Sequence, residues 1–224
     1  YNTAVGAFAG EELTTGIQNT LIGAEAGGTG AITGDNNVAV GFESLTALTG
    51  GASNTAVGYR ALTTMSSTSD LTAVGYKALA VATGIENTAV GFQAGDAVST
   101  GTGNTALGYN TLSAVSGNNS NTAIGASSMN RNTGSSNTAV GAAALGGPAG
   151  TGSSNVAIGA SALAALTDGT FNTGVGNSCM DAATVGRYNT ALGYNSLGSD
   201  IDGDGSVAVG YNALADQESD SVNQ

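Results

Sequence analysis

The chain has 224 residues, of which 37 are glycine and one is proline, and it contains neither histidine nor tryptophan. Charged residues make up 9% of the sequence, and 16 acids against four bases give a formal net charge of −12. The composition excludes collagen, and the abundance of Thr, Val and Ile argues against disorder. The negative net charge argues against binding to nucleic acids and to anionic membrane surfaces. No segment approaches the about 18–20 apolar residues of a membrane span, so we expect no membrane insertion.

A short phrase of the type Asn-Thr-Ala-Val-Gly recurs along the whole chain. It occurs thirteen times, and the twelve intervals between its glycines span 204 residues, a mean period of 17. No interval departs from this period by more than one residue. We call these residues the corner glycines, and they are Gly6, Gly23, Gly41, Gly58, Gly75, Gly91, Gly108, Gly125, Gly141, Gly159, Gly176, Gly193 and Gly210.

The three residues before each corner glycine predict a strand, because they alternate and are rich in β-branched side chains. The last residue of each triplet is Val, Ile or Leu, the middle one is Ala except at Leu21 and Gly174, and the first is Thr except at three valines. The glycine itself suits a sharp corner with positive φ. In chain order the predicted strands are 3–5, 20–22, 38–40, 55–57, 72–74, 88–90, 105–107, 122–124, 138–140, 156–158, 173–175, 190–192 and 207–209.

Other columns of the repeat are almost as regular. Asn lies four residues before the corner glycine in eleven of thirteen copies, and Leu or Met lies four residues after it except at Gly10, Gly27 and Gly95. Recurrent Gly and Asn would break helices, and 17 residues cannot bury a core alone. The sequence therefore predicts an all-β fold, a parallel β-solenoid (β-roll) of thirteen coils of about 17 residues and about 60 Å in length.

We expect residues 1–215 to form one continuous solenoid, followed by an acidic C-terminal segment, 216–224, that leads into a downstream region. The chain begins within a repeat, which indicates a piece of a longer protein. Each coil is expected to hold two short strands and two turns. The aliphatic before the corner glycine and the Leu or Met after it are expected to point inward, with Ala filling gaps.

The alanine column and the corner glycines are expected to share one strand face, which would form a flat apolar stripe along the rod. Soluble monomers rarely expose such stripes, so we expect several copies to pack about a common axis. A homotrimeric rod is preferred, and a monomer with a broader coil stays open.

The repeat resembles those of phage tail fibres and related surface proteins, in the segments Asn54–Leu62, Asn104–Leu112 and Asn189–Leu197. It is also similar to the β-roll head of trimeric autotransporter adhesins, which Val156-Ala157-Ile158-Gly159 matches most closely. The resemblance covers nearly the whole chain, although the adhesin repeat is usually shorter than 17 residues. It implies a homotrimer in an extracellular location, on a virion tail fibre or a cell surface.

Asp200, Asp202 and Asp204 alternate with other residues and precede a turn glycine, as in the first half of a Ca²⁺ loop. The twelfth position of that loop is Tyr211 rather than Glu, and the segment leads into a strand rather than a helix. Either a partial Ca²⁺ site or a solvated acidic turn fits this pattern. No other cofactor is expected.

Five consecutive coils carry an aromatic residue directly after the corner glycine, and these are Phe42, Tyr59, Tyr76, Phe92 and Tyr109. Stacked coils would place the rings about 4.8 Å apart. The column is interpreted either as a structural ladder, which is preferred, or as a glycan-contact strip.

Three further features have structural interpretations. The asparagine column predicts an amide ladder, and Cys179 is expected to be a small, unreactive core residue. The threonine column raises ice binding as an alternative, but that usually requires paired threonine rows and this repeat offers one.

The sequence lacks a histidine base and a recurrent carboxylate pair, so we do not expect an enzyme. The expected function is structural and adhesive: a segment of an extracellular fibre, most of all a phage tail fibre, that presents loops to a glycan or protein receptor on a host. The alternatives are a bacterial autotransporter-like adhesin head and a glycan-cleaving tailspike.

Overall fold

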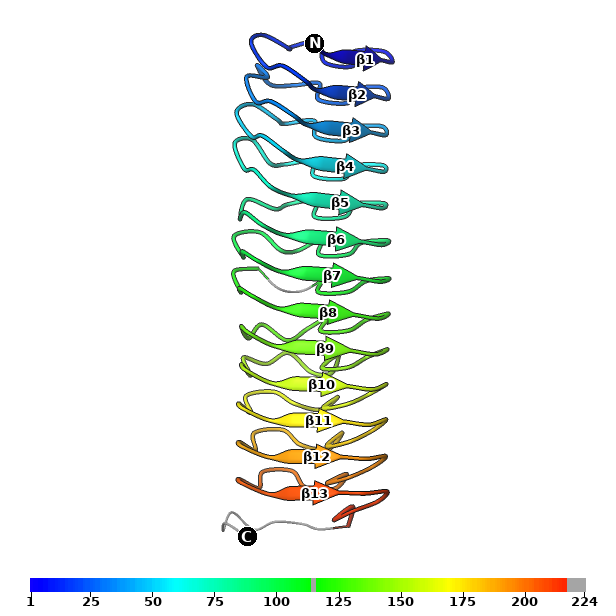
Figure 1. The fold of residues 1–224 in the computed structure, drawn as a ribbon, viewed down its shortest axis with the longest axis vertical. Helices are drawn as coiled ribbons and strands as arrows, with labels where there is room; N and C mark the ends of the chain where they lie inside the picture. Colours follow the sequence, from blue (N-terminus) through cyan, green and yellow to red (C-terminus); the bar gives the residue numbers. More distant parts are fainter. Residues whose placement is uncertain (114–115, 217–224) are drawn as a thin grey trace.

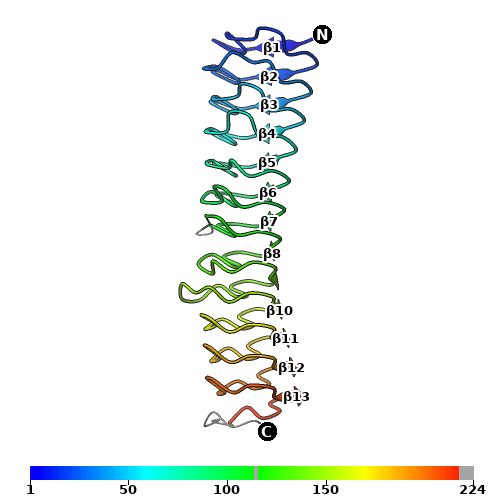
Figure 2. The same ribbon diagram turned by 90° about the vertical axis from the view of Figure 1, so that its left-hand side faces the viewer.

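The computed structural model describes residues 1–113 and 116–216, and it shows a straight rod in which one coil is stacked on the next (Figures 1 and 2). Each coil contributes one three-residue strand to a single sheet along one side of the rod, and loops form the other sides. In the described residues, no helix is long and apolar enough to cross a membrane. Of the expected acidic C-terminal segment, residues 217–224 lie outside the described residues.

Thirteen strands pair in parallel with their neighbours in sequence, and the order of the sheet is β1 to β13 without a crossover. Equivalent residues are partners throughout, as in the pairing of Thr55 with Thr72 and of Val57 with Val74. The predicted solenoid and strand positions are confirmed. The strands are β1 Thr3–Val5, β2 Thr20–Ile22, β3 Val38–Val40, β4 Thr55–Val57, β5 Thr72–Val74, β6 Thr88–Val90, β7 Thr105–Leu107, β8 Thr122–Ile124, β9 Thr138–Val140, β10 Val156–Ile158, β11 Thr173–Val175, β12 Thr190–Leu192 and β13 Val207–Val209.

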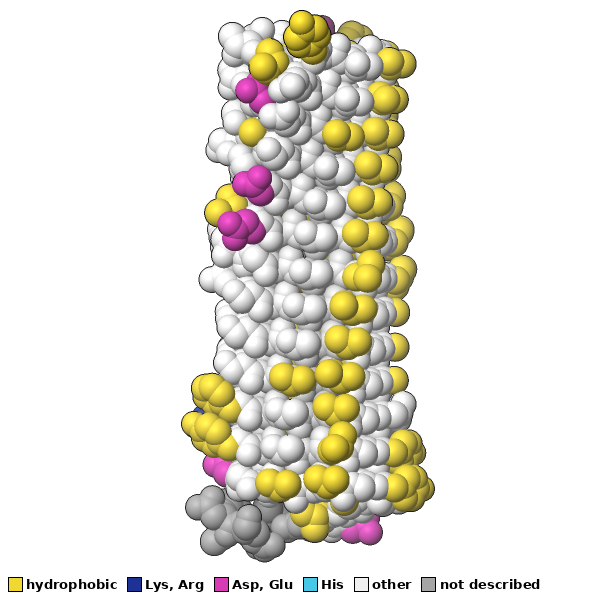
Figure 3. All heavy atoms as spheres, in the orientation of Figure 1, with side chains coloured by type: hydrophobic (Ala, Val, Ile, Leu, Met, Phe, Trp, Pro, Cys, Tyr) yellow, Lys and Arg dark blue, Asp and Glu magenta, His cyan; other side chains and the backbone are white. Residues whose placement is uncertain are grey.

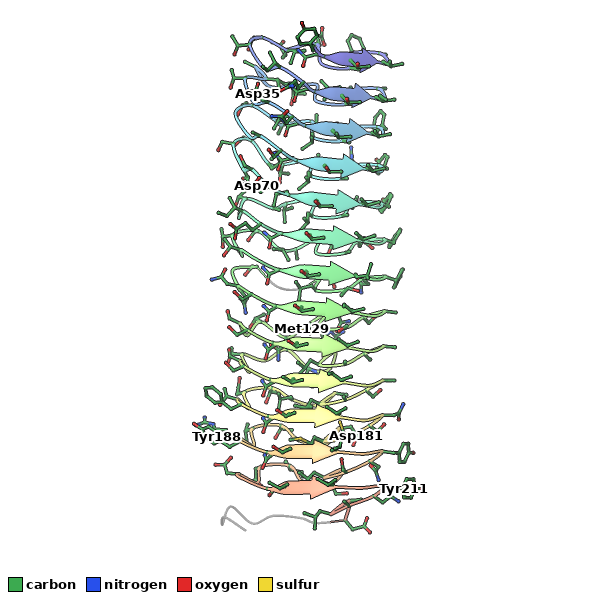
Figure 4. The ribbon with its side chains drawn as sticks, in the orientation of Figure 1. Asp35, Asp70, Met129, Asp181, Tyr188 and Tyr211 are labelled. Atoms are coloured by element: carbon green, nitrogen blue, oxygen red, sulfur yellow. The ribbon has the colours of Figure 1, made fainter. Side chains whose placement is uncertain are left out.

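The predicted orientation of the strand side chains is wrong. The middle residue of the strand, such as Ala56 or Ala73, is fully buried, whereas the aliphatic before the corner glycine lies on the outer face. Successive strand residues point to opposite faces, so the buried alanine forces both of its neighbours outward. The Leu or Met four residues after the glycine does point inward, as Leu62 and Met129 show, and it fills the interior across from the alanine (Figure 4).

Each coil has one strand rather than the expected two. The turn after the corner glycine carries two residues in the left-handed region, such as Arg60 at φ 53° and Leu62 at φ 51°. These angles curl the chain inward and prevent a second extended segment. The turns of adjacent coils are nevertheless hydrogen-bonded, since Leu62 N–H donates to the carbonyl of Ala78 at 3.2 Å.

Exceptions to the repeat in the core compensate one another in size. Leu21 replaces the usual alanine, and the leucine position is glycine in its own coil, at Gly27, and in the preceding coil, at Gly10. A Cβ at Gly10 would lie 2.8 Å from Leu21 Cδ1, and one at Gly27 would lie 3.1 Å from Leu21 Cδ2. A single large side chain therefore takes the space that two small positions leave.

The predicted asparagine ladder is present and buried. Asn54 Nδ2 donates to Asn37 Oδ1 in the preceding coil at 2.9 Å and to the carbonyl of Thr68 in the following coil at 2.9 Å. Asn54 Oδ1 in turn accepts the N–H of Leu71 at 3.0 Å, where leucine replaces asparagine. Leu71 has no side-chain acceptor, and Asn87 Nδ2 donates instead to the carbonyl of Gly84 in its own coil at 3.0 Å and to that of Gly101 in the next coil at 2.7 Å. The Asn54 amide thus joins three coils and satisfies backbone groups that would otherwise be buried without partners.

The corner glycines are required for two separate reasons. Gly58 has φ +131°, a region that side chains rarely adopt. A Cβ there would also lie within 3.0 Å of the backbone of Gly75 in the next coil. The predicted corner with positive φ is confirmed, and the close stacking of coils explains why no larger residue occurs in this column.

Replacement of Gly58 by alanine should lower the free energy of unfolding by about 1–3 kcal/mol, because it adds backbone strain and a clash between coils. Gly50→Ala is the matched control, since φ at Gly50 is not positive and its only near neighbour, Thr33 Oγ1, would lie 3.8 Å from the new Cβ. Urea unfolding followed by circular dichroism measures both variants. Equal stability of the two would contradict the proposed role of the corner.

Cys179 is buried in the core, beside the site where Gly174 replaces alanine. A Cβ at Gly174 would lie 2.9 Å from Cys179 Sγ, so the thiol fills space that a small strand residue leaves. Burial raises the pKa of the thiol from 9.0 to about 11. The expectation of a core cysteine is confirmed.

The buried thiol should make stability depend on pH in the alkaline range. Between pH 9.0 and about 11 the folded chain retains a proton that the unfolded chain loses, so the free energy of unfolding falls as pH rises through this window. Between pH 8 and pH 11 the melting temperature of the parent chain should therefore fall more than that of Cys179→Ala. A constant difference, or rapid labelling of the folded chain by a bulky maleimide at neutral pH, would refute this account.

Candidate functional site

The aromatic residues that follow the corner glycine form a continuous stack over five coils. The centroids of neighbouring rings lie 5.6, 5.1, 4.9 and 5.3 Å apart in order from Phe42 to Tyr109, and no pair of rings is inclined by more than 12°. The column runs along one edge of the sheet, beside the outward aliphatic column (Figure 3). The predicted register is confirmed.

This stacking restricts what the column can bind. The three inner rings, Tyr59, Tyr76 and Phe92, have both faces covered by their neighbours, so only their edges and the hydroxyls of Tyr59 and Tyr76 are accessible. A sugar that stacked face to face on an inner ring would have to displace a neighbouring ring, whereas Phe42 and Tyr109 at the ends of the column each have one face that no ring in the described part of the chain covers. The geometry therefore favours a structural ladder, and any glycan contact along the inner rings would involve edges and hydroxyl groups.

Two cations lie beside the strip. The Arg60 guanidinium is 5.2 Å from the centroid of Tyr59, and Lys77 Nζ is 5.5 Å from that of Tyr76. Arg60 also forms a salt bridge with Glu43 of the preceding coil. Side chains at this turn position thus interact along the rod axis and stabilise the ladder that they flank.

Two further aromatic stacks lie outside the column predicted from the sequence. Phe171 and Tyr188 stack on the loop side of the rod with centroids 5.3 Å apart, whereas Tyr194 and Tyr211 stack on the side of the main strip (Figure 4). Phe171 and Tyr188 both lie five residues before a corner glycine, and this shared position was the available signal.

The acidic loop does not gather its carboxylates. Asp200 is buried and its Oδ1 accepts the N–H of Gly203 at 3.0 Å, Asp202 is exposed, and Asp204 Oδ1 accepts the N–H of Arg187 at 2.7 Å. Among the described residues, no group of three or more acids, cysteines or histidines is placed to hold a metal ion. Two of the three carboxylates therefore have structural partners in the backbone.

The role of Asp204 recurs in other coils. Six residues before the corner glycine, a side-chain oxygen often accepts a backbone N–H from the preceding coil, as Asp35 does from Ile17 at 2.7 Å and Asn119 from Thr102 at 2.8 Å. The polar residue at this loop position is thus a second axial connection, parallel to the asparagine ladder.

Two acids have raised pKa values, because burial of Asp96 and of Asp181 penalises their charged forms. Both lie five residues after a corner glycine, but five coils separate them. This places the carboxyl groups about 24 Å apart at 4.8 Å per coil, whereas a glycosidase pair requires about 5–10 Å. The two groups cannot act as a hydrolytic pair within one chain.

The structural role of the aromatic strip gives a direct test. Tyr76→Ala would interrupt two stacking contacts and should lower the free energy of unfolding by about 1–2 kcal/mol, while retention of the chain on immobilised glycans stays unchanged. Tyr211→Ala is the control, because that ring takes part in one stack, at the end of the rod. Lost retention at unchanged stability would identify the strip as a glycan contact instead.

Comparison of the chain with models of protein families and with curated proteins gives no match. The case for a function therefore depends on the geometry of the rod.

Proposed function

We propose that this chain is a structural and adhesive segment of an extracellular fibre, most of all a phage tail fibre, built from three parallel copies. The observation that carries the proposal is the uninterrupted sheet of thirteen strands in register, which makes each chain a stiff rod about 60 Å long. Such a rod serves as a spacer, and it repeats similar loops at regular intervals along its sides.

Loop repetition supports an adhesive role. Weak contacts between successive loops and a repetitive receptor would add up through multivalency, without a deep pocket on any one coil. Side chains on the loop surface include the exposed Phe171 and Tyr188, and their apolar rings and the Tyr188 hydroxyl suit contacts with a glycan or a protein. The receptor is accordingly proposed to be a cell-surface glycan or protein.

A bacterial cell-surface adhesin head is the second candidate. The phrase Val156-Ala157-Ile158-Gly159, which resembles the adhesin repeat, forms β10 and a corner in the same register as every other coil. Either parent protein would use the rod in the same way. A chaperone domain encoded in the full-length gene would indicate the tail fibre, and a membrane anchor would indicate the adhesin.

The function is tested by coating beads with the 224-residue chain and adding them to a panel of bacterial cells and purified surface polysaccharides. We expect saturable retention that free chain competes for, and no release of reducing sugar ends. Electron micrographs should show rods about 60 Å long. Absence of retention across the panel would contradict the adhesive role, and release of sugar fragments would favour the glycan-cleaving tailspike.

A further inference from the structure

The outward side chains of the sheet form a flat surface that we call the outer strand face. It consists of the first and third residues of each strand, thirteen rows in all, and it faces the viewer in Figure 3. The third residue is always Val, Ile or Leu and is at least partly exposed, for example Ile22, Leu107 and Leu192. A continuous apolar column of this length is comparable with the largest apolar patches of soluble monomers, which often serve as contact surfaces.

The hydroxyl groups on this face differ from those elsewhere on the rod. Loop threonines such as Thr29, Thr49 and Thr83 donate to a carbonyl of the next coil. The ten strand threonines form no side-chain hydrogen bond within the described part of the chain. Their hydroxyls form a row of donors and acceptors that are available to an external surface.

The distribution of charge indicates which surface could cover the outer strand face. The chain carries a net charge of −12, yet no strand residue is acidic or basic. On the face that Figure 3 shows, acidic side chains lie on the loop side and near the C-terminal end, and other acids, such as Glu43 and Asp181, lie in the turns after the corner glycines. Copies of so acidic a chain would repel one another through their loops, and the neutral outer strand face offers the approach with the least repulsion.

The spacing and size of the face fit another copy. Rows repeat every 4.8 Å or so over about 60 Å, so side chains interdigitate along the full length only with a surface of the same period. A strip about 60 Å by 10 Å provides about 600 Å² on each copy, close to the about 800 Å² per partner of stable complexes. The adjacent aromatic strip at the corner adds to this area in the coils of Phe42 to Tyr109.

We propose that the outer strand face is the surface through which copies of this chain pack side by side, parallel and with equivalent coils at the same level. The parallel direction depends on the proposed function, because the two ends of a fibre segment differ in role and all copies must point the same way. The face replaces the alanine and glycine stripe expected from the sequence, since those alanines lie inside the coil. Valine methyl groups would form the apolar contact, and threonine hydroxyls would pair across it.

Crosslinking tests both the contact and its direction. Ile22 in β2 and Leu192 in β12 lie at equal distances from the middle strand β7. Ile22→Cys alone, treated with a short bismaleimide, should give linked chains, and so should Leu192→Cys alone. Antiparallel copies would link only in a mixture of the two variants, which would overturn the proposed direction.

The control variant is Ile85→Cys, because Ile85 is a loop residue that is 46% exposed, against 45% for Leu107 on the outer strand face. It should stay unlinked, as should the parent chain, whose single cysteine is buried. Equal linking of Ile85→Cys would indicate random collision and overturn the proposal.

Solution mass provides an independent test. The parent chain should have the mass of several copies, three in the preferred assembly. The double variant Val74→Asp, Val140→Asp should dissociate to single copies at a protein concentration at least tenfold higher than the parent does. Ile85→Asp should leave the mass unchanged. Circular dichroism and protection of Cys179 from maleimide confirm that the variants remain folded.

The failures of the two proposals are distinguishable. A parent chain that is monomeric, and whose rods still bind bacterial surfaces, would overturn the packing proposal and leave the adhesive function in place. Copies that crosslink in register but bind no surface would do the reverse.

Discussion

The structure depends on hydrogen bonds that run along the rod axis. In each coil the strand and the turns donate to and accept from the coils before and after, as in the bonds from Thr55 N–H to the Leu71 carbonyl at 2.8 Å and from Gly58 N–H to the Val40 carbonyl at 2.7 Å. This pairing requires every coil to follow nearly the same path, so equivalent residues must lie above one another. The asparagine amides, the aromatic rings and the loop carboxylates then form columns because the backbone places them so.

The same constraint explains which residues are tolerated where. A backbone that passes within van der Waals contact of its neighbour admits only glycine at the corner, and the small cross-section holds one or two large side chains per coil, such as Leu62 and Met65. Leu62 fills the space across from the alanine in its coil, whereas Leu21 fills that space from the opposite wall between Gly10 and Gly27. Polar residues enter the interior mainly as asparagines whose amide groups bond to adjacent coils, and also as small residues such as Ser44 and Ser128, whose hydroxyls donate to backbone carbonyls.

The period, strand positions, corner glycines and asparagine ladder were predictable from the sequence, because each depends on which residues recur and how far apart. The direction of the strand side chains was not. The prediction placed Val57 inside because it is larger than Ala56. The alternation of Asn54, Thr55, Ala56 and Val57 allows either face of the strand to point inward. Asn54 and Ala56 share a face, and burial of the asparagine amide turns that face inward. The positive φ angles of the turn could not be predicted either, since Arg60 and Leu62 are not residue types that favour the left-handed region. For the candidate surfaces, the sequence located the aromatic column but not the coverage of its ring faces, which is a three-dimensional property.

One-residue changes in coil length fall in the loops, while the columns stay aligned from β1 to β13. The architecture therefore accepts gain or loss of a whole coil far more readily than of half a coil, which would bring unlike residues, such as glycine and leucine, against each other at the junction. Recombination between similar repeats in the gene would supply such steps. Reach could thus evolve in increments of one coil, about 4.8 Å, without redesign of the interior.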